Sequence, residues 1–165
     1  MDVAVLAVDL DASLIARCRE RSKQRAIRYE EADVTSDSGL QVVREFLAEH
    51  SALKFDLVTC FSVTMWIHLN HGDAGLKIFL ENIASLSNRL LIEPQPWTCY
   101  KTARRRMRKL KQPDFPHMQH LQWTSNVPDD IVRFLTSQCN MKVLTDCGTT
   151  SDWNRPVHLL SSLNS

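Results

Sequence analysis

Two short apolar runs, separated by a stretch of helical length, constrain the fold of this chain more than any other feature. Asp56–Phe61 and Arg89–Ile92 have the length and apolar character of buried strands. In an α/β sheet, ligands bind outside the carboxyl ends of the strands. We therefore expect the polar and aromatic residues that follow the two runs to meet at one rim and form the active site. They are Ser62, Thr64, Trp66, His68, Asn70 and His71 after the first run, and Glu93, Gln95 and Trp97 after the second.

The rest of the chain continues the alternation of strands and helices. Val3–Val8 has the continuous apolar character of a buried strand, Asp11 can cap a following helix, and Ile27–Glu31 is a weaker strand. Apolar stripes predict further helices that begin near Asp37, Asp73 and Pro128, before two late strands, Met141–Thr145 and Val157–Leu160, that could pair antiparallel. The order predicts one α/β domain over residues 1–165, with a mainly parallel sheet and helices on both faces.

Composition excludes several classes of protein. A net charge of +1 gives no global attraction to nucleic acid, so any such attraction must come from a local patch. The five cysteines form no CxxC pair and are odd in number, which favours reduced thiols over disulfides or a zinc site, and we expect no metal. No apolar stretch approaches the ~20 residues of a membrane span, and the sequence shows no signal segment. We expect a soluble protein of the cytoplasm or nucleus.

One local basic patch is evident between Lys101 and Lys111, where seven residues are Lys or Arg. Lys101, Arg104, Arg105 and Arg108 have the spacing of one helical face. Such a run is usually a solvated surface. Here it directly follows Trp97 and Tyr100, whose rings could stack on unpaired bases while the cations hold phosphates.

Two aspartates follow the first two predicted strands. Asp9 could accept hydrogen bonds from both hydroxyls of a ribose, and Asp33 could accept one from an adenine amino group. Each could equally be an ordinary turn or cap residue.

The segments SVTMWIHLNHGDAGL, LLIEPQPWTCY and ARRRMRKL resemble the bicoid-interacting family of RNA 5′-phosphate methyltransferases, and most closely its small RNA 5′-monophosphate branch. The likeness extends from the AVDLD segment to SDWNRPVHLL near the end. It implies a class I, Rossmann-like methyltransferase fold with S-adenosylmethionine as the methyl donor. The implied substrate is the 5′-monophosphate of a small RNA, such as a transfer RNA or a microRNA precursor.

The resemblance also implies roles for single residues. The cofactor would be held by Asp9, Asp33, Val34, Phe61 and Ser62. His68, Asn70 and Gln95 would serve the methyl transfer, with His68 as an orienting donor and not a base. The RNA would contact Trp66, His71, Glu93, Trp97, Tyr100, Lys101, Arg104, Arg105 and Arg108.

The chain departs from the family at its start. Class I methyltransferases normally begin with a strand and a Gly-rich turn, whereas the glycines here are Gly39, Gly72, Gly75 and Gly148. Either that strand precedes Met1, or this is a shortened form that binds the cofactor poorly. The alternatives to an RNA methyltransferase are a catalytically silent RNA-binding module and a small-molecule methyltransferase. The sequence leaves the oligomeric state open.

Overall fold

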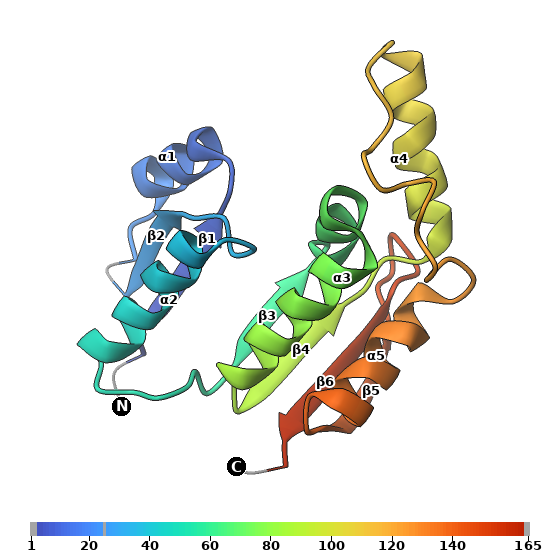
Figure 1. Ribbon diagram of the computed structural model, residues 1–165. Helices are drawn as coiled ribbons and strands as arrows, with labels where there is room; N and C mark the ends of the chain where they lie inside the picture. Colours follow the sequence, from blue (N-terminus) through green and yellow to red (C-terminus); the bar gives the residue numbers. More distant parts are fainter. Residues whose placement is uncertain (1–2, 25, 164–165) are drawn as a thin grey trace. The chain divides into compact units, whose positions relative to one another are not determined.

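The computed structural model describes residues 3–24 and 26–163, which divide into two compact units, Met1–Leu53 and Lys54–Ser165 (Figure 1). The first unit contains β1 (Val5–Asp9), α1 (Ala12–Arg21), β2 (Ile27–Glu31) and α2 (Asp37–Glu49). The strands β1 and β2 pair in parallel from Val5 opposite Ile27 to Asp9 opposite Glu31. Asp11 caps α1 by accepting hydrogen bonds from the amides of Ser13 and Leu14, as predicted.

In the first unit the helices cover opposite faces of the two-stranded sheet. Tyr29 lies beside Leu14 and Cys18 of α1, whereas Arg28 reaches Glu49 of α2. Successive residues of a strand point to opposite faces, so these contacts place α1 and α2 on different sides. The prediction of helices on both faces is confirmed for this sheet.

The second unit is built on a four-stranded sheet in the order β3-β4-β6-β5. β3 (Val58–Phe61) and β4 (Arg89–Glu93) pair in parallel, and β6 (Pro156–Ser162) pairs antiparallel with both β4 and β5 (Met141–Thr149). The late strands therefore form the antiparallel pair that the sequence suggested. Within the described ranges, β1 pairs with one strand, β2, and β3 pairs with one strand, β4.

Three helices accompany this sheet: α3 (Thr64–Ser85), α4 (Trp97–Lys109) and α5 (Val127–Gln138). α3 packs on β3 and β4, α5 packs on β5, and the two helices contact each other. In Figure 1, α3 and α5 lie along the sheet, whereas α4 extends beyond the end of β4. The core between them contains fully buried Leu76, Leu80, Leu90, Ile92, Ile131, Leu135 and Leu160. Each contributes about 1.5–3 kcal/mol by burial.

α3 begins nine residues before the position expected near Asp73, so the predicted rim residues 64–71 are helical. Gly72 interrupts the helix with φ of 69° and ψ of −174°, a backbone conformation essentially restricted to glycine. A Cβ on Gly72 would lie 3.0 Å from Nδ1 of His117. The apolar stripe that predicted a helix from Asp73 therefore corresponds to its second half. No helix among the described residues is long and apolar enough to cross a membrane.

Candidate active site

The carboxyl ends of β3 and β4 lie side by side because the two strands are parallel and Phe61 pairs with Glu93. The next residue, Ser62, has a φ of 58°, which turns the chain sharply at the end of β3. Its hydroxyl donates a 2.8 Å hydrogen bond to Oε2 of Glu93. Two residues that the sequence predicted to meet at a common rim are thus in direct contact.

Gln95, two residues after the end of β4, is hydrogen-bonded to the start of α3. Its Oε1 accepts hydrogen bonds of 3.1 Å from the hydroxyl of Thr64 and from the amide of Met65. The N-cap residue of α3, Val63, offers no side-chain acceptor, so Gln95 satisfies an amide that the helix leaves unpaired. Gln95 is 1% exposed, and its side-chain oxygen fixes where α3 starts relative to the end of β4.

His68 joins α3 to α4 from a fully buried position. Its Nδ1 lies 3.0 Å from the hydroxyl of Tyr100, which is also fully buried. Its Nε2 lies 3.4 Å from Oδ1 of Asp73, and Asp73 accepts 3.0 Å hydrogen bonds from the amides of Gln122 and Trp123. Burial lowers the pKa of His68, although Asp73 opposes that shift, and burial likewise raises the pKa of Tyr100. Both residues are enclosed, and their contact links α3 to α4.

The exposed part of the predicted rim lies on one side of α3. Trp66 is 46% exposed and packs edge-on against Phe115, and the amide of Asn70 donates a 2.8 Å hydrogen bond to the carbonyl of Trp66. Asn70 and His71 are exposed. Trp97, at the start of α4, is half-buried against Tyr100, with ring centroids 4.9 Å apart. This part of the rim offers aromatic faces and neutral donors.

Arg155, in the loop between β5 and β6, completes the cluster although no role was predicted for it. Its Nη1 donates to the hydroxyl of Ser62 at 2.5 Å and lies 3.6 Å from Oε2 of Glu93. Both charged side chains are largely buried, at 14% and 6% exposed. The guanidinium also stacks over Trp153, and in the described part of the chain its buried Nε has no hydrogen-bond partner. A single arginine 93 positions after Ser62 gives no local signal that could have revealed this contact.

The predicted cationic face of α4 is largely present. Lys101, Arg105 and Arg108 are exposed, whereas Arg104 is half-buried and donates through Nε to Asp114 at 2.7 Å. Arg104 is therefore engaged within the protein. The exposed neighbours Arg106, Lys109 and Lys111 extend the cationic surface.

The remaining predicted cofactor residues belong to both units, three of them to the first and one to the second. Asp9 is exposed at the carboxyl end of β1, where its Oδ1 accepts from the amide of Asp11. Asp33 is half-buried and its Oδ1 accepts from the amide and hydroxyl of Thr35, while Val34 is half-buried beside it. Phe61, in the second unit, is 48% exposed. An exposed carboxylate at a strand end fits a ribose, because it can accept hydrogen bonds from both hydroxyls.

No three His, Cys, Asp or Glu side chains of the described residues gather as metal ligands would. The arrangement thus offers a buried acid and arginine, neutral donors, exposed aromatic rings and a cationic helix. Such groups suit the binding of an anionic, base-containing ligand.

The chain is similar to a known protein family and to several of its members. The family described as Bicoid-interacting protein 3 (Bin3) matches residues 55–162. The pre-miRNA 5′-monophosphate methyltransferase of Xenopus laevis is 40% identical over 159 residues, covering 95% of this chain and 62% of that protein. The RNA 5′-monophosphate methyltransferase of Homo sapiens is 40% identical over 157 residues, covering 94% of this chain and 53% of that protein. The chain thus spans somewhat over half the length of these relatives.

Solved structures with low sequence identity share the fold. Magnesium protoporphyrin IX methyltransferase from Synechocystis PCC 6803 has a TM-score of 0.58 at 15% identity, covering 96% of this chain and 64% of that one. The N-methyltransferase NodS from Bradyrhizobium japonicum has a TM-score of 0.58 at 12% identity, and the match covers 96% of this chain and 73% of that one. The fold is that of class I S-adenosylmethionine-dependent methyltransferases.

Proposed function

The chain belongs to the Bicoid-interacting protein 3 (Bin3) family, and on that premise we propose that it transfers a methyl group from S-adenosylmethionine to the 5′-monophosphate of a small RNA. Its relatives, which are RNA or pre-miRNA 5′-monophosphate methyltransferases, support this substrate. The observation that carries the proposal is the direct hydrogen bonding of the segment that leads from β3 into α3 to the last residue of β4 and to the segment that follows it. Ser62 bonds Glu93, and Gln95 bonds Thr64 and Met65.

The bound cofactor would supply a methyl group on a sulfonium, which is open to attack by an oxygen nucleophile. In the second unit, Phe61 and Ser62 would line its site at the end of β3. In the first unit, Asp9 would accept the ribose hydroxyls, and Asp33 with Val34 would lie beside the adenine. Calorimetry with Asp9→Ala tests the assignment directly: cofactor affinity should fall while RNA affinity stays unchanged.

The chemistry needs no general base. The second ionisation of a phosphate monoester has a pKa of about 6, so near neutral pH the 5′-phosphate already carries a nucleophilic oxygen. The task of the protein is to hold that oxygen in line with the methyl group. The exposed amide of Asn70 can orient the phosphate without a full positive charge, which would stabilise the ground state and weaken the nucleophile. His68, enclosed between Tyr100 and Asp73, would hold α4 in position.

The RNA beyond its first phosphate would lie on the aromatic and cationic surface. Trp66 and Trp97 expose ring surface on which bases can stack, and Lys101, Arg105 and Arg108 can contact phosphates. Neutralising Arg105 and Arg108 to glutamine should weaken RNA binding several-fold and reduce its salt dependence, because fewer counterions are released. The matched control is Arg104→Gln, which removes a cation already paired with Asp114 and should have the smaller effect.

The decisive experiment offers the protein labelled S-adenosylmethionine and RNA hairpins that bear a 5′-monophosphate or a 5′-hydroxyl. The proposal predicts label transfer to the monophosphate alone. Salt-dependent RNA binding without label transfer would favour a catalytically silent RNA-binding module. Turnover of a small acceptor that is unaffected by Arg105→Gln/Arg108→Gln would instead indicate a small-molecule methyltransferase.

A further inference from the structure

A second cationic surface lies in the first unit, on the C-terminal half of α1 and on β2. Between Ala12 and Gln24 the sequence has four cations, Arg17, Arg19, Arg21 and Lys23, and one carboxylate, Glu20. We call the part of this region formed by Leu14, Arg17, Cys18, Arg21, Ser22, Lys23 and Tyr29 the α1–β2 surface. None of these residues belongs to the candidate active site.

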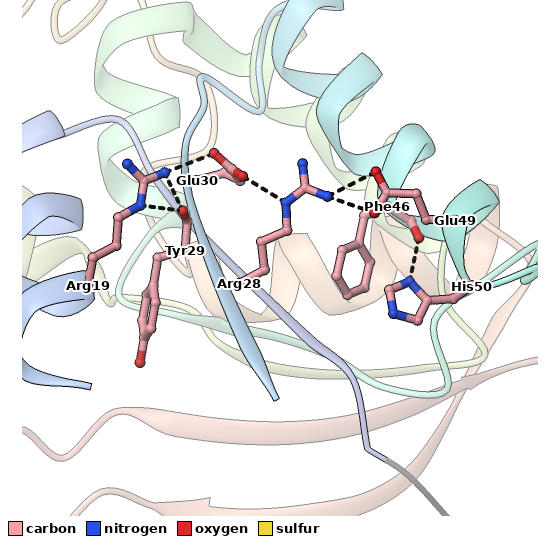
Figure 2. A network of polar contacts seen from close by, with 7 residues as sticks. All are labelled: Arg19, Arg28, Tyr29, Glu30, Phe46, Glu49 and His50. Atoms are coloured by element: carbon pink, nitrogen blue, oxygen red, sulfur yellow. Dashed lines mark hydrogen bonds and ion pairs between the residues drawn. The ribbon is translucent and has the colours of Figure 1, made fainter. Parts of the chain in front are cut away.

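Part of the positive charge of this region is neutralised within the protein. Figure 2 shows Arg19 and Arg28 on either side of Glu30, with Arg28 also reaching Glu49 of α2. The ion pairs measure 2.9 Å from Arg19 to Glu30, 2.7 Å from Arg28 to Glu30 and 2.8 Å from Arg28 to Glu49. Arg19 further donates to the carbonyl of Tyr29 on β2. These two arginines therefore tie α1, β2 and α2 together.

The other three cations make no ion pair with a described residue, although Arg17 interacts electrostatically with Asp11 and donates through Nε to the carbonyl of Ser13. Arg17, Arg21 and Lys23 are exposed, and among residues 3–24 and 26–163 no carboxylate lies within 4.0 Å of their charged groups. Arg17 and Arg21 are four residues apart on one face of α1, where like charges repel each other. An anionic ligand would relieve that repulsion.

The floor between these cations is concave and partly aromatic. A depression of about 360 Å³ is lined by Leu14, Arg17, Cys18, Arg21, Ser22 and Tyr29. A second depression, of about 400 Å³, adjoins it at Ser22 and Tyr29. Tyr29 is half-buried, so part of its ring can be reached from outside. Two arginines above an aromatic and aliphatic floor match a nucleotide, whose phosphate meets the cations while its base or sugar packs on the ring.

We propose that the α1–β2 surface is a second RNA-contact surface, which binds the sugar–phosphate backbone of the substrate. The inference rests on the proposed RNA methyltransferase function. It adds that affinity for RNA depends on Arg17, Arg21 and Lys23 as well as on α4. The surface strengthens RNA binding and takes no part in the transfer step.

The test compares two triple variants of the full chain that lose equal charge. Arg17→Gln/Arg21→Gln/Lys23→Gln removes the cations of the α1–β2 surface. Arg44→Gln/Arg89→Gln/Lys142→Gln removes three exposed cations elsewhere. Binding of a 5′-monophosphorylated RNA hairpin is measured by fluorescence anisotropy over a salt series. The first variant should bind about tenfold more weakly, with the slope of log K against log salt reduced by about 2, and the control should stay within about twofold of the wild type.

Two further measurements keep the inference testable on its own. In the wild-type protein, RNA should protect the Lys23 amine from acetylation, whereas a polyglutamate peptide of equal charge should protect it less. Equal RNA affinity of the two variants, or no protection of Lys23 by RNA, would overturn the inference. Stronger protection by polyglutamate would also overturn it, in favour of an acidic protein partner.

The failure of this inference is distinguishable from the failure of the proposed function. If the first triple variant transfers methyl groups normally and binds RNA with unchanged affinity, the α1–β2 surface is not an RNA-contact surface, and the methyltransferase assignment stands. If that variant loses RNA affinity and the wild type transfers no label, the α1–β2 surface is supported as an RNA-contact surface and the methyltransferase assignment is contradicted.

Discussion

Arg155 and Glu93 form an ion pair in which both side chains are nearly enclosed, and Ser62 bridges them by hydrogen bonds. Removing one partner of a buried pair leaves the other charge without compensation, which costs more than removing both. We therefore expect Arg155→Ala to destabilise the protein by about 3 kcal/mol, and Arg155→Ala/Glu93→Gln by clearly less. Urea unfolding of the two single variants and the double variant measures this. Additive effects would show that the two charges are not coupled.

Protonation of the buried His68 makes the stability of the protein depend on pH. Burial holds its pKa below the unfolded value of about 6.5, so the unfolded chain takes up the proton first as the pH falls. The contribution of His68 is therefore fully present above that pH and is lost progressively below it. Between pH 7 and pH 5.5 the wild type should therefore lose free energy of unfolding that His68→Gln does not lose. Parallel urea titrations at the two pH values measure the difference, and equal pH dependence would contradict the prediction.

At the scale of elements, Gly72 divides α3 into two helical halves. An alanine there would have to adopt a positive φ and would bring its Cβ to 3.0 Å from Nδ1 of His117. We expect Gly72→Ala to destabilise the protein by about 2 kcal/mol or more. Gly148→Ala is the control, because Gly148 also has a positive φ but open space around its Cβ position. Thermal unfolding should show the larger loss for Gly72→Ala, and equal losses would mean that the contact with His117 costs nothing.

The elements show what the sequence could and could not predict. β2 was predicted with its observed bounds, and the meeting of Ser62 with Glu93 followed from the rule that parallel strands end at one edge. The helical character of residues 64–71 was missed, because polar and aromatic residues there were interpreted as a strand tip. Arg155 was missed because its partners are remote in sequence. The capping role of Gln95 depends likewise on a tertiary contact that local patterns do not encode.

At the scale of the whole molecule, the two units differ in how well their strands are enclosed. No residue of β1 or β2 is fully buried, and each of these strands pairs with the other. In the second unit, β4 lies between β3 and β6, and Leu90, Ile92 and Leu160 have no exposed surface. A two-stranded sheet with a small core is marginally stable, so local opening should cost less in the first unit.

This difference predicts the order of amide hydrogen exchange. Amides of β1 and β2 should exchange faster than those of β4 and β6, because β1 and β2 have no fully buried residue whereas β4 and β6 contain residues without exposed surface. Exchange monitored by mass spectrometry resolves these segments. Glu30→Gln provides the matched perturbation, since it removes the carboxylate shared by Arg19 and Arg28 and should accelerate exchange in β2 while leaving β4 unchanged. If β1 and β2 exchanged as slowly as β4, the first unit would owe its stability to contacts beyond its own small core.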